Sequence, residues 1–208
     1  MNNSTQTNTP KIIFGTIVAF LTWFSIVFQF YLTTGSITNL FSYFTILCNL
    51  LVALSLSFSI FFPKTKTGIY FSSISVQTAI ALYIFIVALV YNSVLRGLLI
   101  LEGWQIVVDN MLHVVIPILY LLYWFFFVPK TYLNWKNGMY WILFPLFYLI
   151  YSLIRGAIVQ WYPYPFLNAD KFGYAHVLFN IGMMVFVFLL GAMGVIALTK
   201  IKYNKTHR

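Results

Sequence analysis

The sequence contains few charged residues, and acids are the scarcest of them. Its 208 residues include three Asp and Glu residues, 12 Lys and Arg residues and one cysteine. Charged residues make up 7% of the chain, whereas soluble domains have about 25%. This scarcity excludes an ordinary soluble domain, and the single Cys48 excludes an internal disulfide. Hydrophobic residues make up 62% of the chain and aromatic residues 21%, which is typical of an integral membrane protein.

Six apolar runs, separated by polar turns, are each long enough to cross a bilayer as a helix, which takes roughly 20 residues. They cover residues 12–31, 40–62, 69–91, 104–127, 139–159 and 174–198. We therefore expect an all-α, polytopic membrane protein with one bundle of six transmembrane helices at 11–199. The polar residues 1–10 are expected to form a disordered tail, and residues 200–208 a basic cytoplasmic tail.

Basic residues are concentrated in alternate loops, which predicts the orientation. One set of loops and tails holds nine of them, namely Lys11, Lys64, Lys66, Lys130, Lys136, Lys200, Lys202, Lys205 and Arg208. The other set holds only Arg96 and Lys171. The positive-inside rule therefore places both termini in the cytoplasm. Because the basic residues are scattered over short loops, we expect no nucleic-acid partner.

Ionisable residues lie inside the span 104–127. Asp109 and Asn110 precede His113 by four and three residues, so all three share one helical face. Charged groups at this depth are costly, and that face is expected to point away from lipid. Pro117 lacks the N–H that would bond the carbonyl of His113, which loosens the helix at this point.

Three further spans bring polar residues to the same predicted outer layer. They are Ser42, Thr45 and Asn49 in 40–62, Ser152 and Arg155 in 139–159, and His176 and Asn180 in 174–198. The inner halves of the spans look almost entirely apolar. The pattern predicts a buried polar network or a functional site in the outer half of the bundle.

Each of these residues has a structural and a functional interpretation. His113 is either a general base oriented by Asp109 or Asn110, or a packing residue with a hydrogen bond. Thr45 is either a nucleophile activated by an adjacent base or a hydroxyl that bonds a backbone carbonyl. Arg155 either extends to the headgroups or binds an anionic group. The His, Cys and acidic residues do not have a zinc-binding spacing, so no metal or cofactor is expected.

Three short segments carry a resemblance to a known family: YFTILCN at 43–49, LHVVIP at 112–117 and WYPYPFL at 161–167. In this order, the chain resembles the six-span family of the androgen-induced protein and the androgen-dependent TFPI-regulating protein, together with related bacterial membrane proteins. The resemblance implies an intramembrane hydrolase of fatty acid esters of hydroxy fatty acids, with Thr45 and His113 as the catalytic threonine and histidine. It also implies a bacterial plasma membrane. The chain has Cys48 where the animal members carry an acid and Asp109 where they carry an amide.

The leading hypothesis is thus a lipid ester hydrolase in which Thr45 attacks, His113 takes the proton and Asp109 orients the imidazole. Contacts to the substrate or its oxyanion are expected from Asn49, Asn110, Arg155, His176 and Asn180. The alternative is a membrane protein that binds or transports lipid without chemistry. An intramembrane protease is disfavoured because no span contains a G-x-S-x nucleophile turn.

Overall fold

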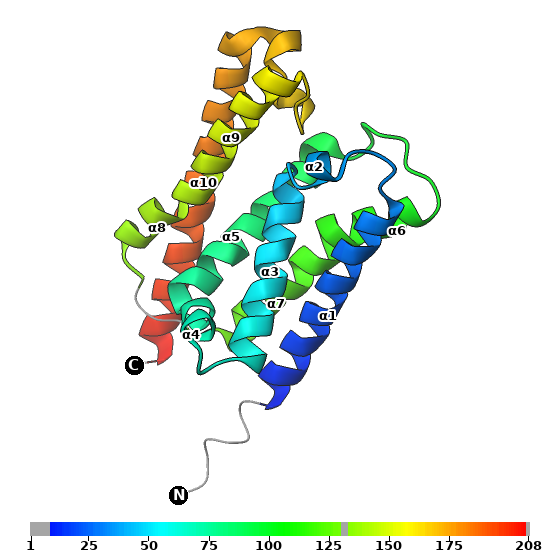
Figure 1. The fold of residues 1–208 in the computed structure, drawn as a ribbon. Coiled ribbons are helices and arrows are strands. Elements are labelled where there is room, and N and C mark those ends of the chain that lie inside the picture. Colours follow the sequence, from blue (N-terminus) through cyan, green and yellow to red (C-terminus); the bar gives the residue numbers. More distant parts are fainter. Residues whose placement is uncertain (1–8, 130–132, 207–208) are drawn as a thin grey trace, which may run out of the picture. The chain divides into compact units, whose positions relative to one another are not determined.

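The computed structural model describes residues 9–129 and 133–206, with side chains up to Lys200. Throughout this part of the chain the regular elements are helices, and six of them are long and apolar enough to cross a membrane (Figure 1). The all-α, six-span architecture predicted from the sequence is confirmed. The first helix begins at Thr9, so Thr9 and Pro10 are helical and do not belong to the expected tail. Residues 1–8, Lys130 and the end of the basic tail at 207–208 lie outside the described residues.

The chain divides into two compact units, and we describe each by itself. The first unit contains residues 1–40 and 45–129, and the second contains residues 41–44 and 130–208. The single bundle expected for 11–199 stays a prediction.

The first unit contains four membrane-spanning segments that lie alongside one another (Figure 1). The fourth predicted span is continuous from Trp104 to Phe127, as expected, but contains a π-helical turn. The elements of this unit are α1 (Thr9–Leu32), α2 (Ile37–Leu40), α3 (Phe44–Phe61), α4 (Lys66–Ser72), α5 (Ile74–Val90), the π turn η1 (Tyr91–Leu95), α6 (Trp104–Asn110), the π turn η2 (Met111–Val115) and α7 (Ile116–Phe127).

The second and third spans begin later in the structure than predicted. The third span is not one helix from residue 69, because Ser73 is extended and its hydroxyl accepts a hydrogen bond from the Val76 N–H. A serine cap of this kind ends α4 and starts α5. The second span begins at Phe44, not at residue 40, so Ser42 does not continue the helical stripe of Thr45 and Asn49. Ser42 belongs to the second unit.

The second unit is a helical hairpin closed by an aromatic loop. Its elements are α8 (Trp135–Trp141), α9 (Leu143–Val159), the 3-10 turn η3 (Pro165–Leu167) and α10 (Ala169–Thr206), which is kinked at Gly173 with φ 75° and ψ 155°. The Ser42 hydroxyl lies 3.0 Å from the Tyr151 hydroxyl, and the Tyr148 hydroxyl donates to the Ser42 carbonyl at 2.9 Å. These bonds tie residues 41–44 to α9. Burial raises the pKa of the nearby Tyr43 phenol above its ordinary value.

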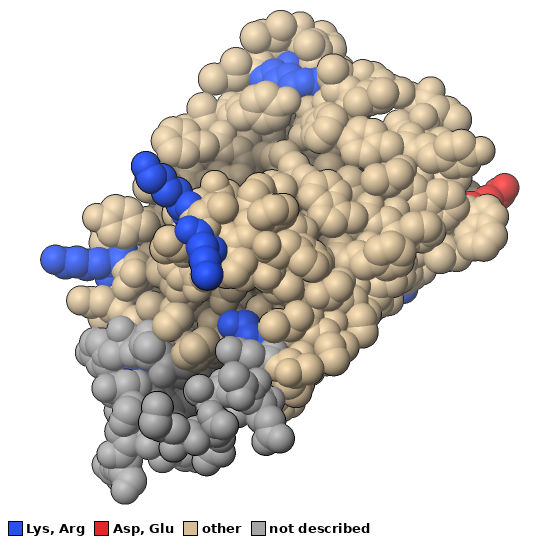
Figure 2. All heavy atoms as spheres, turned by 60° about the horizontal axis from the view of Figure 1, so that its bottom comes forward, with Lys and Arg blue, Asp and Glu red and all other residues tan. Residues whose placement is uncertain are grey.

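Apolar side chains dominate the surface. On the face seen in Figure 2, most atoms belong to residues other than Lys, Arg, Asp and Glu. Phe20, on α1, is 69% exposed, and Phe179, on α10, is 67% exposed. Large apolar groups in water would be unfavourable, so the exposed faces of these helices fit contact with lipid tails.

The part of the first unit at the start of α5, which the sequence predicts to be its inner half, also contains buried polar residues. Gln77 and Thr78 are buried near the start of α5, and the Trp124 indole N–H donates to the Thr78 hydroxyl at 3.0 Å. Buried polar residues of this unit are therefore not confined to the layer of Thr45 and His113. Single polar residues in an apolar run, and the polar atoms of Tyr and Trp, do not disturb a hydropathy pattern even when they pair across helices.

Candidate functional site

The structure brings Thr45 and His113 together from different helices. Thr45 is the second residue of α3, and its hydroxyl lies 3.1 Å from the Nε2 atom of His113 in η2. Thr45 is 7% exposed and the His113 side chain 14%. The predicted nucleophile and base are thus within hydrogen-bond distance in a largely buried position.

The hydrogen-bond network determines the tautomer of His113. Its Nδ1 atom lies 2.9 Å from the Asp109 carbonyl and 3.1 Å from the Asp109 Oδ1 atom. Both neighbours are acceptors, so Nδ1 must carry a proton. In the neutral ring, Nε2 then has the free lone pair and accepts the hydrogen bond from Thr45. This is the protonation state that a general base needs.

Tyr91 holds this arrangement from a third element. Its ring stacks on the His113 ring, with centroids 3.8 Å apart and an angle of 14° between the planes. Its hydroxyl donates to Oδ2 of Asp109, whose other carboxylate oxygen faces His113. The imidazole is therefore fixed by a ring face on one side and by a hydrogen-bonded carboxylate at Nδ1. Tyr91 is not among the residues predicted from the sequence, because it lies at the very end of an apolar span.

The π turn at His113 has an identifiable cause. The Ile116 N–H bonds the Met111 carbonyl, five residues back, and Pro117 has no N–H. The Leu112 carbonyl thus loses both of its possible donors further along the helix. Asn49 supplies the replacement, since its Nδ2 atom donates to the Leu112 carbonyl at 3.1 Å.

Asn49 links the two halves of the pair. Besides the Leu112 carbonyl, its Nδ2 atom donates to the Thr45 carbonyl at 2.9 Å, and the residue is fully buried. Both amide N–H groups are therefore engaged by backbone oxygens. This geometry does not fit the predicted role of oxyanion donor. It fits a residue that holds α3 against the π turn.

A second polar group surrounds the guanidinium of Arg96. The Nη1 atom donates to the Asn92 side-chain oxygen and the Nη2 atom to the Asn110 side-chain oxygen, each at 2.8 Å. The Nδ2 atom of Asn92 also lies 3.5 Å from the His113 carbonyl, a long contact. Asn110 thus contacts Arg96 and not the His113 ring, so Asp109 alone takes the orienting position that the sequence left open between the two.

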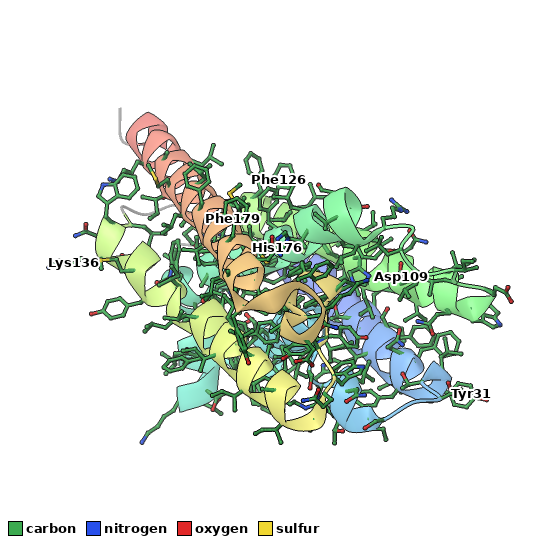
Figure 3. The ribbon with its side chains drawn as sticks, turned by 90° about the horizontal axis from the view of Figure 1, so that it is seen from above. Tyr31, Asp109, Phe126, Lys136, His176 and Phe179 are labelled. Carbon is green, nitrogen blue, oxygen red and sulfur yellow. The ribbon has the colours of Figure 1, made fainter. Side chains whose placement is uncertain are left out.

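The remaining predicted residues lie in the second unit. Figure 3 labels Asp109 on the fourth span and His176 on α10. The Arg155 guanidinium lies over the Trp161 ring at 5.1 Å, and the His176 ring stacks on Phe172 at 5.5 Å. The Asn180 amide donates to the Phe166 carbonyl at 3.0 Å and so anchors the aromatic loop to α10. Their participation in the same site as Thr45 stays a prediction.

The chain matches no family model, no curated protein and no solved structure. The described residues contain no group of three or more His, Cys, Asp or Glu side chains that could hold a metal ion. Function is therefore inferred from the group of Thr45, His113 and Asp109 in the first unit. That site offers a hydroxyl, a base with a free lone pair and an orienting carboxylate, which together can activate the hydroxyl for attack on a carbonyl.

Proposed function

We propose that the protein is an intramembrane hydrolase of lipid esters, with Thr45 as nucleophile and His113 as general base. The observation that carries the proposal is the chain of contacts from the Thr45 hydroxyl to Nε2 of His113, and from Nδ1 to Asp109. A threonine with a merely structural role usually bonds a backbone carbonyl one turn back. The Thr45 hydroxyl also meets the Nε2 atom of a ring whose tautomer allows it to accept the hydroxyl proton.

The reaction follows the logic of a catalytic triad. Thr45 Oγ1 attacks the ester carbonyl while its proton moves to Nε2 of His113, and a tetrahedral oxyanion forms. Collapse of this intermediate breaks the ester C–O bond, and the leaving alcohol takes the proton from Nε2. Water then attacks the acyl-threonine with His113 as base, which releases the acid and restores the hydroxyl. Asp109 stabilises the imidazolium in both halves of the reaction.

The first turn of α3 is the proposed source of oxyanion stabilisation in this unit. Thr45 is its second residue, and the first N–H groups of a helix have no carbonyl partner within the helix. The positive end of the helix dipole adds to the effect. One well-placed donor of this kind typically lowers the barrier by about 3 kcal/mol.

The proposed substrate is an ester with a long hydrocarbon part, such as a fatty acid ester of a hydroxy fatty acid. Two observations support an apolar substrate: the site lies within a membrane-spanning segment, and the surrounding helices expose apolar faces. The family resemblance of the segments around Thr45 and His113 points to the same substrate class. A bacterial plasma membrane is the proposed location.

The test is labelling of the purified protein with a fluorophosphonate probe, followed by mapping of the modified residue. We expect an adduct on Thr45 that is lost in Thr45→Val and in His113→Ala and is retained in Thr45→Ser. Melting temperatures of the variants must stay close to that of the parent protein. Labelling at another residue, or unchanged ester hydrolysis by folded Thr45→Val, would overturn the proposal.

The alternative is a protein that binds or transports lipid without chemistry. The cation over an aromatic ring at Arg155 and Trp161 is the observation that favours it, because such a pair suits an interfacial headgroup contact. Under this alternative, Arg155→Gln abolishes lipid binding, while Thr45→Val leaves both binding and the lipid composition of the membrane unchanged.

A further inference from the structure

Arg96 is connected to the region of His113 through Asn92, and its own hydrogen-bond partners are neutral side chains. It follows directly on the π turn η1, where the Arg96 N–H bonds the Tyr91 carbonyl at 2.8 Å. The side chain then runs back along the turn, so that Asn92 and Asn110 hold its two terminal nitrogens. Two different segments therefore fix the plane of the guanidinium.

Arg96 makes no direct ion pair with the described residues of the first unit. Its two hydrogen-bond partners are uncharged amide oxygens, and no Asp or Glu pairs with it in the part of the chain that the structure describes. The nearest acid along the network is Asp109, whose carboxylate contacts Tyr91 and His113 and not the guanidinium. A guanidinium has five N–H donors, so three remain beyond the two that the asparagines use.

These features define a recognition site for an anion. We propose that Arg96, oriented by Asn92 and Asn110, binds the carboxylate or phosphate group of an amphiphile at the outer end of the first unit. A planar fork with three remaining donors fits either group, and an arginine that is already oriented loses less side-chain entropy on binding. This site is distinct from the Thr45 and His113 pair, and binding to it does not require ester hydrolysis.

The carrier of the anion is an amphiphile, because the residues around Arg96 present hydrocarbon. Val94 is 54% exposed and Leu98 is 59% exposed, on either side of Arg96 in the chain. Val107, three residues before Asn110 on α6, is 47% exposed. A small hydrophilic anion would gain nothing from these side chains, whereas an alkyl chain would cover them.

The position of the site relates it to the proposed chemistry. Asn92 reaches the His113 carbonyl, and Asn110 follows Asp109 directly in the chain. The two residues that orient Arg96 are thus also neighbours of the histidine and of its orienting carboxylate. If Thr45 cleaves an ester, a step that rests on the proposed function, Arg96 selects esters that also carry an acidic group.

The test measures binding of three amphiphiles with equal alkyl chains: dodecanoate, dodecyl phosphate and neutral dodecanol. The protein is purified in the uncharged detergent dodecyl maltoside, and each compound displaces an environment-sensitive dansyl fatty acid. We expect one or both anions to displace the probe at concentrations about tenfold lower than dodecanol, the effect of one charge-assisted hydrogen bond. The better anion identifies the group as carboxylate or phosphate.

Variants distinguish binding at Arg96 from a general attraction of anions to the basic protein. Arg96→Gln should remove the advantage of the anions, and Arg96→Lys should weaken it because a lysine lacks the planar fork. Lys171→Gln removes the other basic residue predicted on the outer side and should leave the advantage intact. Equal binding of anions and dodecanol, or a full advantage in folded Arg96→Gln, would overturn the proposal.

The outcome is independent of the hydrolase proposal, because displacement reports binding and not turnover. Thr45→Val should retain the anion preference in full. Absence of a Thr45 adduct would thus count against the hydrolase alone, while loss of the Arg96 dependence would count against the anion site alone.

Discussion

At the scale of single residues, the hydrogen bond from Tyr91 to Asp109 tests whether His113 acts as a general base or only packs in the core. Tyr91→Phe keeps the ring stacked on His113 but removes the hydrogen bond to Asp109. We expect the rate of fluorophosphonate labelling at Thr45 to fall by about tenfold, since one hydrogen bond to a charged group contributes about 1.5 kcal/mol or more. The half-saturating probe concentration should not change. Tyr91→Leu, which also removes the stacking, should lower the rate further.

Asn49 tests a different property, the attachment of α3 to the π turn. Asn49→Asp is isosteric but turns two donated hydrogen bonds into repulsion between the carboxylate and two backbone carbonyls. Asn49→Leu removes the bonds without adding charge and should cost about 1–2 kcal/mol. Thermal unfolding in detergent should therefore rank the parent above Asn49→Leu and Asn49→Leu above Asn49→Asp. An aspartate variant as stable as the parent would contradict this role.

The residues of the pair could be predicted from the sequence, but their supports could not. The second and fourth spans both start on the predicted outer side, so the matching depths of Thr45 and His113 predicted their proximity. The spacing placed Asp109 and Asn110 on the face of His113 without deciding between them. Tyr91 could not be predicted, because the sequence does not indicate which group the hydroxyl of a tyrosine in an apolar run will bond. Asn49 was predicted as a polar residue at the depth of Thr45 and His113. Its hydrogen bond to the Leu112 carbonyl could not be predicted, because that carbonyl lacks a helical donor only as a result of the π turn.

At the scale of elements, Pro117 controls the register of the fourth span. Pro117→Ala restores the missing N–H, so a regular α-helix could form through His113 and remove the π turn. Each residue would then rotate relative to α3, and His113 Nε2 would leave the Thr45 hydroxyl. We expect the variant to be at least as stable as the parent while its labelling at Thr45 falls by about tenfold or more.

The matched control for this variant lies in the second unit. Pro145 is the third residue of α9, where a missing N–H costs no helical hydrogen bond. Pro145→Ala should leave labelling unchanged, whereas equal loss in both proline variants would indicate a general effect on folding. Labelling at the parent rate in Pro117→Ala would show that the π turn is not needed.

The number of spans could be predicted from the sequence, because six apolar runs are each long enough to cross a bilayer and polar turns separate them. The two π turns could not, since they depend on which carbonyls lose a donor and which side chains replace it. The early end of α4 at Ser73 shows the same limit. A serine in an apolar run does not indicate by itself that its hydroxyl will cap a helix, as Ser73 caps α5.

At the scale of the whole molecule, the orientation in the membrane is the prediction that decides which side supplies substrate and water. Impermeant maleimide labelling tests it in a Cys48→Ser background, which removes the natural thiol. Cysteines placed at Ser36 and Lys171 should react in intact cells, and those at Lys64 and Lys136 only after permeabilisation. This pattern puts the Arg96 and Thr45 groups in the outer half, where an amphiphile from the outer leaflet can reach them. The reverse pattern would place the same site on the cytoplasmic side, so that its anionic ligand would have to come from the inner leaflet.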